Sequence, residues 1–495
     1  MTDHDHSTTV GQIPKPSADD ASLAPVVFTR LAWGLFAASL VALVARLGTD
    51  GSWTVGSLVA VDGLTVLLWV VATFFSGIVH SYSRRYMAGE AHADRFFRNI
   101  FAFTLAVLVL AAANHVVLFV AAWLTMGLVM AELIGHVRGW PQAQAAGRLA
   151  RRYFVASSLL VAVAVTVLWQ ATGATTISGI AASAPTLSSQ TTLLAVGALV
   201  LAAMIQSALL PFHTWLLSSM TAPTPASALM HAGFVNAGGI LLTRFGSVFA
   251  GDVTLATAIL VVGATSALLG KLLKSVQANV KRQLGCSTIG QMGFMILQVG
   301  LGFFAAAIAH LVLHGFYKAY LFLSAGDQVE HTSPADSHSR TTTLRDALAV
   351  AVTALLGGAL FAGLTGKGTA VDSGLLLVLF VILTTLHAAR DVLSQGELQA
   401  TVRYAAVPLL VIPAIGVYAL VYKAVAAQMV GLPVVTEPTA LTPIHWALAA
   451  VFVAAYAAIE LGAVRHSRRL YVALTNLGQP DSDTLLTSTE DYNEY

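Results

Sequence analysis

Long apolar runs, separated by short polar connections, follow one another along most of the chain. A helix of about 20 apolar residues spans the hydrocarbon core of a bilayer, so each run predicts one transmembrane helix. The runs lie at residues 27–47, 60–82, 98–113, 115–137, 151–171, 191–210, 225–246, 253–273, 285–302, 303–325, 344–365, 373–390, 402–424 and 443–464. The pattern therefore predicts an all-α polytopic membrane protein with about 14 transmembrane helices.

Basic residues gather after the even-numbered runs, whereas the connection from 172 to 190 has no charge and that from 425 to 442 has only Glu437. Connections rich in lysine and arginine normally face the cytoplasm. We therefore expect both termini in the cytoplasm, which an even number of spans requires. The basic residues are Arg84, Arg85, Arg95, Arg98, Arg138, Arg148, Arg151, Arg152, Lys274, Lys281, Arg282, Arg340, Arg345, Arg465, Arg468 and Arg469.

Short connections predict one membrane domain, residues 26–465, between two cytoplasmic tails. Residues 1–25 are polar and are expected to be disordered; residues 466–495 end in an acidic segment that we expect to stay disordered from Pro480 until something binds it. The longest connection, 326–345, is polar, and both a docking surface and a solvated loop have this composition. We favour the solvated loop. Its acidic and histidine residues are Asp327, Glu330, His331, Asp336 and His338.

Composition supports the membrane assignment and excludes several other classes. Apolar residues make up 57% of the chain and charged residues 10%, whereas about a quarter of residues are charged in soluble proteins. The net charge is +2 and no basic run is interleaved with aromatics, so we expect no nucleic-acid partner. The single cysteine, Cys286, excludes a disulfide framework and a metal site built from several thiolates. The first 25 residues lack the basic and apolar regions of a signal peptide.

Three titratable residues recur every four positions in the apolar run HLVLHGFYKAYLFL, residues 310–323: His310, His314 and Lys318. A four-residue step returns to nearly the same face of a helix, so the three side chains form one stripe. Ionisable groups at membrane depth are costly and usually mark a functional site. We interpret the stripe as a proton path. The alternative is a pair of interfacial histidines and a lysine that extends its ammonium to the membrane surface.

Prolines interrupt a second polar region, LLPFHTWLLSSMTAPTPASALMHAGFVNAGGILLTRF, residues 209–245. Because Pro211, Pro223 and Pro225 do not fit inside a continuous helix, we expect a broken helix, a short connector and a new helix that starts near Pro225. Broken helices supply freed carbonyls that bind ions at depth. His231 follows in the new helix, as a candidate for the path or as a structural histidine bonded to a carbonyl.

Three sequence motifs follow one another along the chain: PTPASALMHAG, then KRQLGCSTIGQMGF at residues 281–294, then HLVLHGFYKAYLFLSAG. In this the chain resembles the antiporter-like membrane subunits shared by respiratory complex I, membrane-bound hydrogenases and multisubunit sodium/proton antiporters. The resemblance covers roughly residues 58–400. It implies two inverted five-helix repeats, each with a broken helix, and a central hydrophilic axis for protons.

Site residues follow from the resemblance by position. His231 matches the family's bridging histidine after the broken helix. His310, His314 and Lys318 match the central histidines and lysine of the second half. Lys367, in AGLTGK, matches the lysine of the following broken helix, although the family's motif there is longer and more polar.

The first half departs from the family pattern. The glutamate expected after Trp123 is replaced by Leu124, and the lysine expected before the PTP segment is replaced by Gln206. Glu132 lies a little over two turns beyond Leu124 on roughly the same face, and Lys271 is an intramembrane cation of the eighth run. We hypothesise that Glu132 and Lys271 are a relocated pair or that Glu132 gates proton access from the cytoplasm. The alternative is that the first half does not conduct.

The MHAGFVNAGGILLTRF and HGFYKAYLFLSAG segments are more similar to the membrane subunits of inorganic-carbon accumulation complexes, the DabB type, than to complex I subunits. This resemblance implies a prokaryotic plasma (inner) membrane protein that conducts cations, with protons expected before sodium ions. It also implies a cytoplasmic DabA-like partner, a zinc-bearing subunit resembling β-type carbonic anhydrases. The chain itself is then not an enzyme and carries no cofactor. The alternatives are a proton-pumping subunit of a redox complex and a sodium/proton antiporter subunit.

The other charged residues carry less weight. Asp62 begins the second run and is either a helix cap or part of a path. Arg244 and Glu460 lie near helix ends and are expected to extend to the membrane surface. A last group lies at the inner end of the twelfth run, where an interfacial charge network is favoured: His387, Arg390, Asp391 and Glu397.

Overall fold

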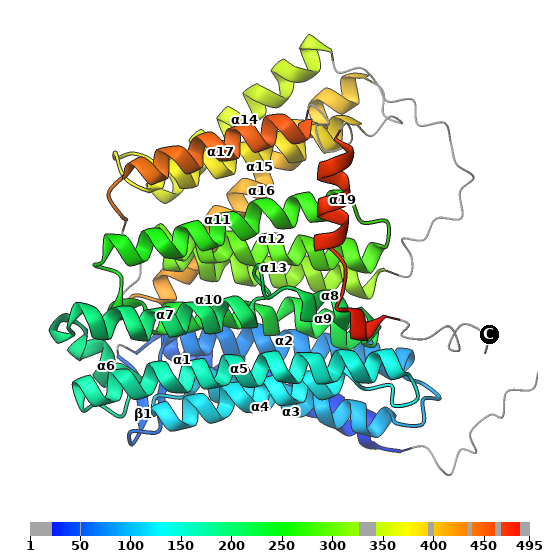
Figure 1. The fold of residues 1–495 in the computed structure, drawn as a ribbon, viewed down its shortest axis with the longest axis vertical. Helices are drawn as coiled ribbons and strands as arrows, with labels where there is room; N and C mark the ends of the chain where they lie inside the picture. The colour runs from blue at the N-terminus through cyan, green and yellow to red at the C-terminus, as the bar shows by residue number, and fades with distance from the viewer. Residues whose placement is uncertain are drawn as a thin grey trace, which may run out of the picture.

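The computed structural model forms one bundle of mostly parallel and antiparallel helices (Figure 1). It describes residues 22–49, 51–325, 343–394, 400–432, 438–460 and 467–485. The polar connection with Asp327 to Arg340, together with Glu397, Glu437, Arg465 and the two chain ends, lies outside the described residues.

The first ten helices contain the interrupted region around the PTP segment. In chain order they are α1 Ala24–Leu47, α2 Gly63–Tyr86, α3 Ala93–Ala112, α4 Val116–Ile134, α5 Pro141–Thr172, α6 Ile177–Ser183, α7 Ser189–Gln206, α8 Thr214–Ser218, α9 Thr224–Ala232 and α10 Ala237–Arg244. We call this part the first half. An antiparallel hairpin, β1 Trp53–Val55 and β2 Val59–Val61, lies between α1 and α2.

The second half follows with longer, uninterrupted helices. They are α11 Val253–Ser275, α12 Val280–Gly300, α13 Phe304–Leu323, α14 Leu344–Thr365, α15 Gly374–Ser394, α16 Ala400–Gln428 and α17 Pro443–Glu460, followed by the short α19 Arg468–Leu477. Single 3₁₀ turns occur at Ala184–Thr186, Ser219–Thr221, Phe234–Asn236, Gly246–Val248 and Ser482–Thr484.

The all-α membrane fold is confirmed, and each predicted apolar run overlaps at least one of these helices. Within the described ranges, eleven helical segments are long and apolar enough to cross a bilayer, with α9 and α10 counted together. The helices α12, α15 and α17 are not among them. The number of 14 spans and the inverted repeats therefore stay predictions.

The prolines and glycines set the breaks in the first half. Helix α7 ends at Gln206, and α9 begins at Thr224 between two prolines, as predicted. A second break, which the sequence did not predict, separates α9 from α10 at Gly233, where the backbone leaves the helical conformation. The segment from α7 to α10 is thus interrupted twice, and His231 lies just before the second break.

Helices α11 and α12 pack backbone against backbone through small residues. An added Cβ at Gly263 would overlap the Leu297 backbone, and one at Gly270 would overlap the Gly290 backbone. Such close approach is typical of small-residue helix pairs in membranes. It fixes α12 against α11 and leaves another face of α12 to contact α13.

The bundle has two distinct ends. We call the end that carries β1 and β2 the hairpin end; here the Leu58 carbonyl accepts the Asn114 amide at 2.9 Å. We call the opposite end, which carries Arg84, Arg138 and Lys274, the basic end. Helix α19 crosses the basic end at a large angle to the long helices (Figure 1).

The start of the acidic C-terminal segment is ordered at the basic end, so the expectation of disorder from Pro480 onward is wrong for residues 480–485. His213 Nε2 donates to the Leu477 carbonyl at 2.8 Å. The Ser218 hydroxyl accepts the Asp481 amide at 3.1 Å and the Thr484 hydroxyl at 3.0 Å. These bonds supply partners for polar groups of the segment around α8. Residues 486–495 lie outside the described part of the chain.

Candidate functional site: a buried lysine and histidine stripe

Helix α13 buries His310, His314 and Lys318 on one face, as their spacing predicts. The Lys318 side chain is fully buried, and its ammonium donates a hydrogen bond to the Leu284 carbonyl of α12 at 2.9 Å. Ion pairs among the described residues join Arg151 to Glu132 and Arg244 to Asp62, so no described carboxylate pairs with Lys318. A backbone carbonyl therefore takes the place of an acidic partner.

His231 reaches the same carbonyl through Thr288. Its Nδ1 lies 3.0 Å from the Thr288 hydroxyl, which itself donates to the Leu284 carbonyl at 2.9 Å. Since the hydroxyl has one hydrogen, we assign the proton of a neutral His231 to Nδ1, which leaves Nε2 as an acceptor. The His231 ring also stacks on Phe322, with centroids 4.3 Å apart. The interrupted first-half helix is thereby connected to Lys318.

The two histidines of α13 continue the stripe toward the hairpin end. The His310 and His314 rings lie nearly parallel, 5.8 Å apart, and His310 packs against Phe294 of α12 at 5.5 Å. Within the described structure, Nε2 of His231, Nε2 of His310 and both ring nitrogens of His314 have no hydrogen-bond partner. Buried polar atoms normally have one, and ordered water is the usual partner when protein groups are not. The stripe thus has the chemistry of a water-assisted proton relay.

Leu284 and Thr288 are site residues that sequence reasoning missed. Both lie in the KRQLGCSTIGQMGF run, four residues apart, and therefore on one face of α12. That spacing was the available signal for Thr288. The role of Leu284 comes from its backbone, and a side-chain pattern does not show it.

The relocated pair of Glu132 and Lys271 is wrong. Glu132 forms an ion pair with Arg151 of the neighbouring helix α5, and both side chains are about half exposed, at 48% and 54%. Lys271 instead lies with its ammonium 2.6 Å from His387 Nε2 on α15. Packing of α4 on α5 brings the guanidinium within reach, so Glu132 is already paired. The gating role of Glu132 stays a prediction.

Lys367 lies in the connection between α14 and α15 and not inside a broken helix. Helix α14 ends at Thr365 because Gly366 adopts the left-handed conformation, with φ of 70°. The Lys367 ammonium lies 4.9 Å from the centre of the Phe303 ring, just before α13 begins. The cation is therefore at the hairpin end of the bundle, beyond His310.

Apart from the mostly buried Asp62–Arg244 pair at the hairpin end, the first half has no buried charged side chain among the described residues. Among the described side chains, the buried members of the lysine, arginine, aspartate and glutamate class are Lys318 and Asp346, both in the second half. Gln206 is buried where the family carries a lysine, and its Nε2 has no described partner. Trp123 donates to the Ser157 hydroxyl at 3.1 Å. The two positions at which the resemblance implies an ion pair therefore carry the uncharged residues Leu124 and Gln206.

Asp62 and Arg244 form the ion pair at the hairpin end. Asp62 caps α2 by accepting the Thr65 amide at 2.7 Å, as one of its two readings predicted. Arg244 donates to Asp62, to the Thr65 hydroxyl at 2.8 Å and to the Ala111 carbonyl at 2.9 Å. The expectation that Arg244 extends to the membrane surface is therefore wrong, because a buried acceptor set holds it.

The pKa of Asp62 reflects this pairing. Burial alone would raise the pKa of the carboxyl, but the charge of Arg244 and the hydrogen bonds from Arg244 and Thr65 outweigh burial and hold the pKa below its usual value. The ion pair fixes the end of α10 to the start of α2.

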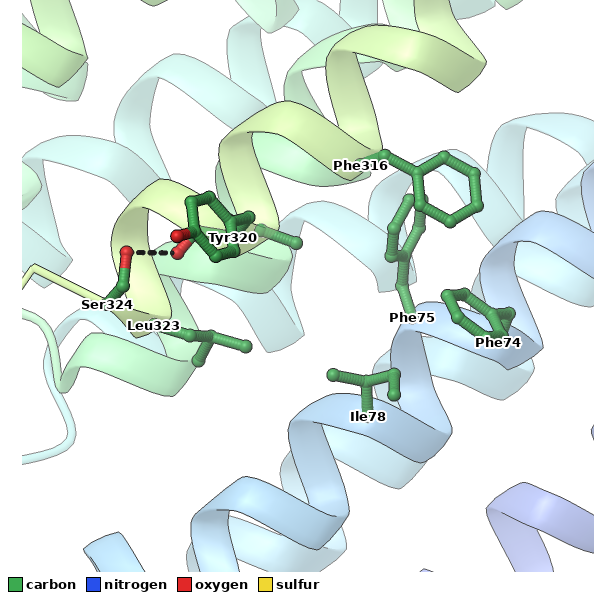
Figure 2. Close-up of a pocket in the computed structure, with 8 residues that line it drawn as sticks. Phe74, Phe75, Ile78, Phe316, Tyr320, Leu323 and Ser324 are labelled. Atoms are coloured by element: carbon green, nitrogen blue, oxygen red, sulfur yellow. Dashed lines mark hydrogen bonds between the residues drawn. The ribbon is translucent and has the colours of Figure 1, made fainter.

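A separate apolar groove of about 370 Å³ lies between α2 and α13 (Figure 2). It uses a different face of α13 from the stripe, and Phe316 and Tyr320 are 46% and 70% exposed there. The lining of the groove contains no histidine, lysine or carboxylate. Its lining residues are Phe74, Phe75, Ile78, Phe316, Ala319, Tyr320, Leu323 and Ser324.

These features define a polytopic membrane protein with a buried line of histidine and lysine side chains between packed helices. The family model for the transmembrane part of NADH:quinone oxidoreductases and Mrp antiporters matches residues 113–392, more than half of the chain. The model for the N-terminus of chain 5 of NADH-ubiquinone oxidoreductase (complex I) matches residues 50–97. The chain belongs to this antiporter-like family.

Relatives within the family have two kinds of name. The chain is 38% identical over 307 residues to a probable inorganic carbon transporter subunit DabB1 of Halothiobacillus neapolitanus, covering 59% of this chain and 55% of the relative. It is 34% identical to a probable subunit DabB of Bacillus subtilis, covering 71% and 70%. It is 33% identical to NADH-quinone oxidoreductase subunit L of Mycobacterium tuberculosis, covering 64% and 51%. The matched part thus spans little more than half of several relatives.

The fold is also similar to a solved structure, the Mrp complex from Dietzia. The TM-score is 0.57 at 23% sequence identity, and the match covers 93% of this chain and 51% of the other. At this identity the similarity supports the fold and leaves the transported ion open.

Proposed function

We propose that the chain is the cation-conducting membrane subunit of an inorganic-carbon uptake pump, with protons as the conducted ion. The similarity to DabB subunits supports the pump, and the fully buried Lys318 with its two histidines carries the assignment of conduction. In this proposal the hydration of carbon dioxide takes place on a separate zinc-bearing subunit resembling carbonic anhydrases. This chain supplies the energy and performs no catalysis.

Proton movement along the stripe follows from its geometry. A charge at membrane depth costs about 3 kcal/mol or more by conservative scales, so an ammonium bonded to one carbonyl readily gives up its proton to a neighbouring base. His314 and His310 lie one and two turns away on the same face and exchange protons through water. One charge crossing 100 mV releases about 2.3 kcal/mol. This free energy shifts the equilibrium of a coupled reaction by more than about tenfold, so it makes the hydration of carbon dioxide directional.

Conduction is assigned to the second half together with His231. Away from the Asp62–Arg244 pair at the hairpin end, no described first-half side chain is a buried charge, and this supports the choice over conduction by both halves. Lys271 and His387 are placed as proton exchangers toward the basic end, and Lys367 toward the hairpin end. Partner contacts are expected at the basic end, around residues 84–98 and around residues 327–345. Most of the second range lies outside the described residues. In this proposal the basic end lies on the cytoplasmic side of a bacterial inner membrane.

A redox-complex subunit is the second candidate, because the chain is 33% identical to an NADH-quinone oxidoreductase subunit. Purification of the complex under mild conditions separates the two. A zinc-containing partner related to carbonic anhydrases supports the uptake pump, whereas partners with flavin and iron-sulfur clusters would replace it with the redox function.

Within the pump, Lys318→Ala tests conduction. We expect bicarbonate accumulation by cells to be abolished while the complex still assembles. Lys423→Ala is a matched control, because Lys423 is an exposed lysine of the membrane helix α16. Undiminished accumulation in the Lys318 variant would show that the stripe is not the path.

A further inference from the structure

The stripe on α13 ends at His310, well before the hairpin end of the bundle. Beyond His310 the face of α13 is apolar, with Ala306 one turn away. The neighbouring helix α12 continues the polar line. Its Phe294 packs on His310, and Gln298 follows one turn later on the same face, toward the hairpin end.

Gln298 has the features of a group that faces water inside the bundle. Its side chain is fully buried, and Nε2 donates to the Tyr418 hydroxyl of α16 at 3.3 Å. Its Oε1 has no partner in the described structure, in common with His310 Nε2. An unpaired buried amide oxygen costs about 1–3 kcal/mol, so a structural role alone would favour an apolar residue here.

Polar groups continue from this pair to the hairpin end. The Ser373 hydroxyl donates to the Leu301 carbonyl at 2.7 Å and accepts the Thr439 amide at 3.0 Å. His445 lies next in line, with its Nδ1 2.8 Å from the Thr442 hydroxyl. These groups come from three connections and helix starts that meet beyond the end of α12. Polar groups thus gather at the hairpin end, beyond the end of α12.

We propose that protons move between His310 and the hairpin end through water that Gln298 orients and through the Tyr418 hydroxyl. This inference rests on the proposed function, because it extends the conduction path of Lys318. The Tyr418 hydroxyl both donates and accepts hydrogen bonds, so it relays a proton without a net charge, and Gln298 Oε1 holds the intervening water. The Tyr418 ring packs 5.8 Å from Phe361, which fixes the hydroxyl in place.

The experiment compares variants of the assembled complex in proteoliposomes, with proton flux driven by an imposed membrane potential. We expect Gln298→Leu to lower the flux about tenfold and Tyr418→Phe to lower it about threefold to tenfold, since each removes a relay group and keeps the side-chain volume. Tyr153→Phe is the matched control. It removes a tyrosine hydroxyl that lies 3.0 Å from Thr214 in the first half, and the flux should not change.

The variant Gln298→Glu distinguishes a role in conduction from a purely structural role, because only a role in conduction makes the proton flux depend on the new carboxyl. It retains the acceptor oxygens and adds a titratable group, so flux should recover at least in part and gain a new pH dependence. Normal flux in Gln298→Leu and Tyr418→Phe, with Lys318→Ala inactive, would overturn the inference and leave the proposed function intact. Normal flux in Lys318→Ala would overturn the proposed function itself. If Gln298→Leu fails to assemble, Tyr418→Phe decides alone, because the phenylalanine keeps the ring contact.

Discussion

Lys318 donates its hydrogen bond to the backbone carbonyl of Leu284, at 2.9 Å, and not to a carboxylate. The same carbonyl accepts the Thr288 hydroxyl, which links it to His231. One carbonyl of α12 therefore joins the interrupted helix of the first half to the lysine of the second. A partial charge stabilises an ammonium less than a full charge does, so the Leu284 carbonyl holds the Lys318 ammonium less firmly than a carboxylate would.

Thr288→Val tests this link. The substitution keeps the shape of the side chain and removes the hydroxyl between His231 and Leu284, so we expect proton flux to fall about threefold to tenfold and stability to fall by about 1 kcal/mol. Flux in proteoliposomes and thermal melting of the purified complex measure the two effects. Thr257→Val is the control, because the Thr257 hydroxyl bonds only within α11, to the Val253 carbonyl. Equal flux in both variants would contradict the link.

The Asp62–Arg244 pair should matter for stability. Removing one member of a mostly buried ion pair leaves the other unpaired, so we expect Asp62→Asn to lower the free energy of unfolding by about 2–4 kcal/mol. Glu132→Gln breaks the half-exposed pair with Arg151 and should cost less than about 1 kcal/mol. Thermal melting compares the two variants directly. A smaller effect at Asp62 than at Glu132 would contradict the assignment of Arg244.

Because of His136, we expect the folded protein to lose stability in mild acid. His136 lies between α4 and α5, where burial, followed by the charges of Arg95, His92 and Arg138, lowers its pKa from 6.5 to about 4. Because the unfolded chain binds the proton more readily, this contribution is complete above about pH 6.5 and declines as the pH falls from 6.5 toward 4. We expect His136→Gln to flatten the change in melting temperature between pH 7.5 and pH 5. An unchanged slope would show that His136 does not titrate in this window.

The C-terminal segment should detach when Ser218 is changed. Ser218→Ala removes the hydroxyl that holds Asp481 and Thr484, so we expect faster cleavage between residues 478 and 485 in limited proteolysis. Ser219→Ala is the matched control, because the Ser219 hydroxyl bonds only to the nearby Leu216 carbonyl. Equal cleavage of the two variants would mean that the segment is held by other contacts.

Local patterns predicted the parts of the structure that depend on neighbouring residues. Apolar runs located the helices, the two prolines at 223 and 225 located the start of α9, and the four-residue spacing placed His310, His314 and Lys318 on one buried face. These features depend on helix periodicity and on the missing amide of proline, and both are visible within about ten residues.

Contacts between distant residues were beyond such patterns. Asp62 and Arg244 meet only because α2 begins and α10 ends on the same side of the bundle. The hypothesis that Glu132 pairs with Lys271 overlooks Arg151, which packing brings to Glu132 from α5. The Leu284 carbonyl belongs to the backbone, so its role depends on where Lys318 packs. The bonds from Ser218 to Asp481 and Thr484 depend on a fold that brings two remote segments together.

Voltage-driven proton flux through the purified complex in vesicles tests the central claim most directly, with Lys318→Ala compared with Lys423→Ala. Flux is followed by the change in internal pH after a potential of known sign is imposed. The account predicts that the Lys318 variant loses at least about nine-tenths of the flux, while the Lys423 variant, changed at an exposed position of α16, stays within about twofold of the unaltered protein. Undiminished flux in an assembled Lys318→Ala complex would contradict it.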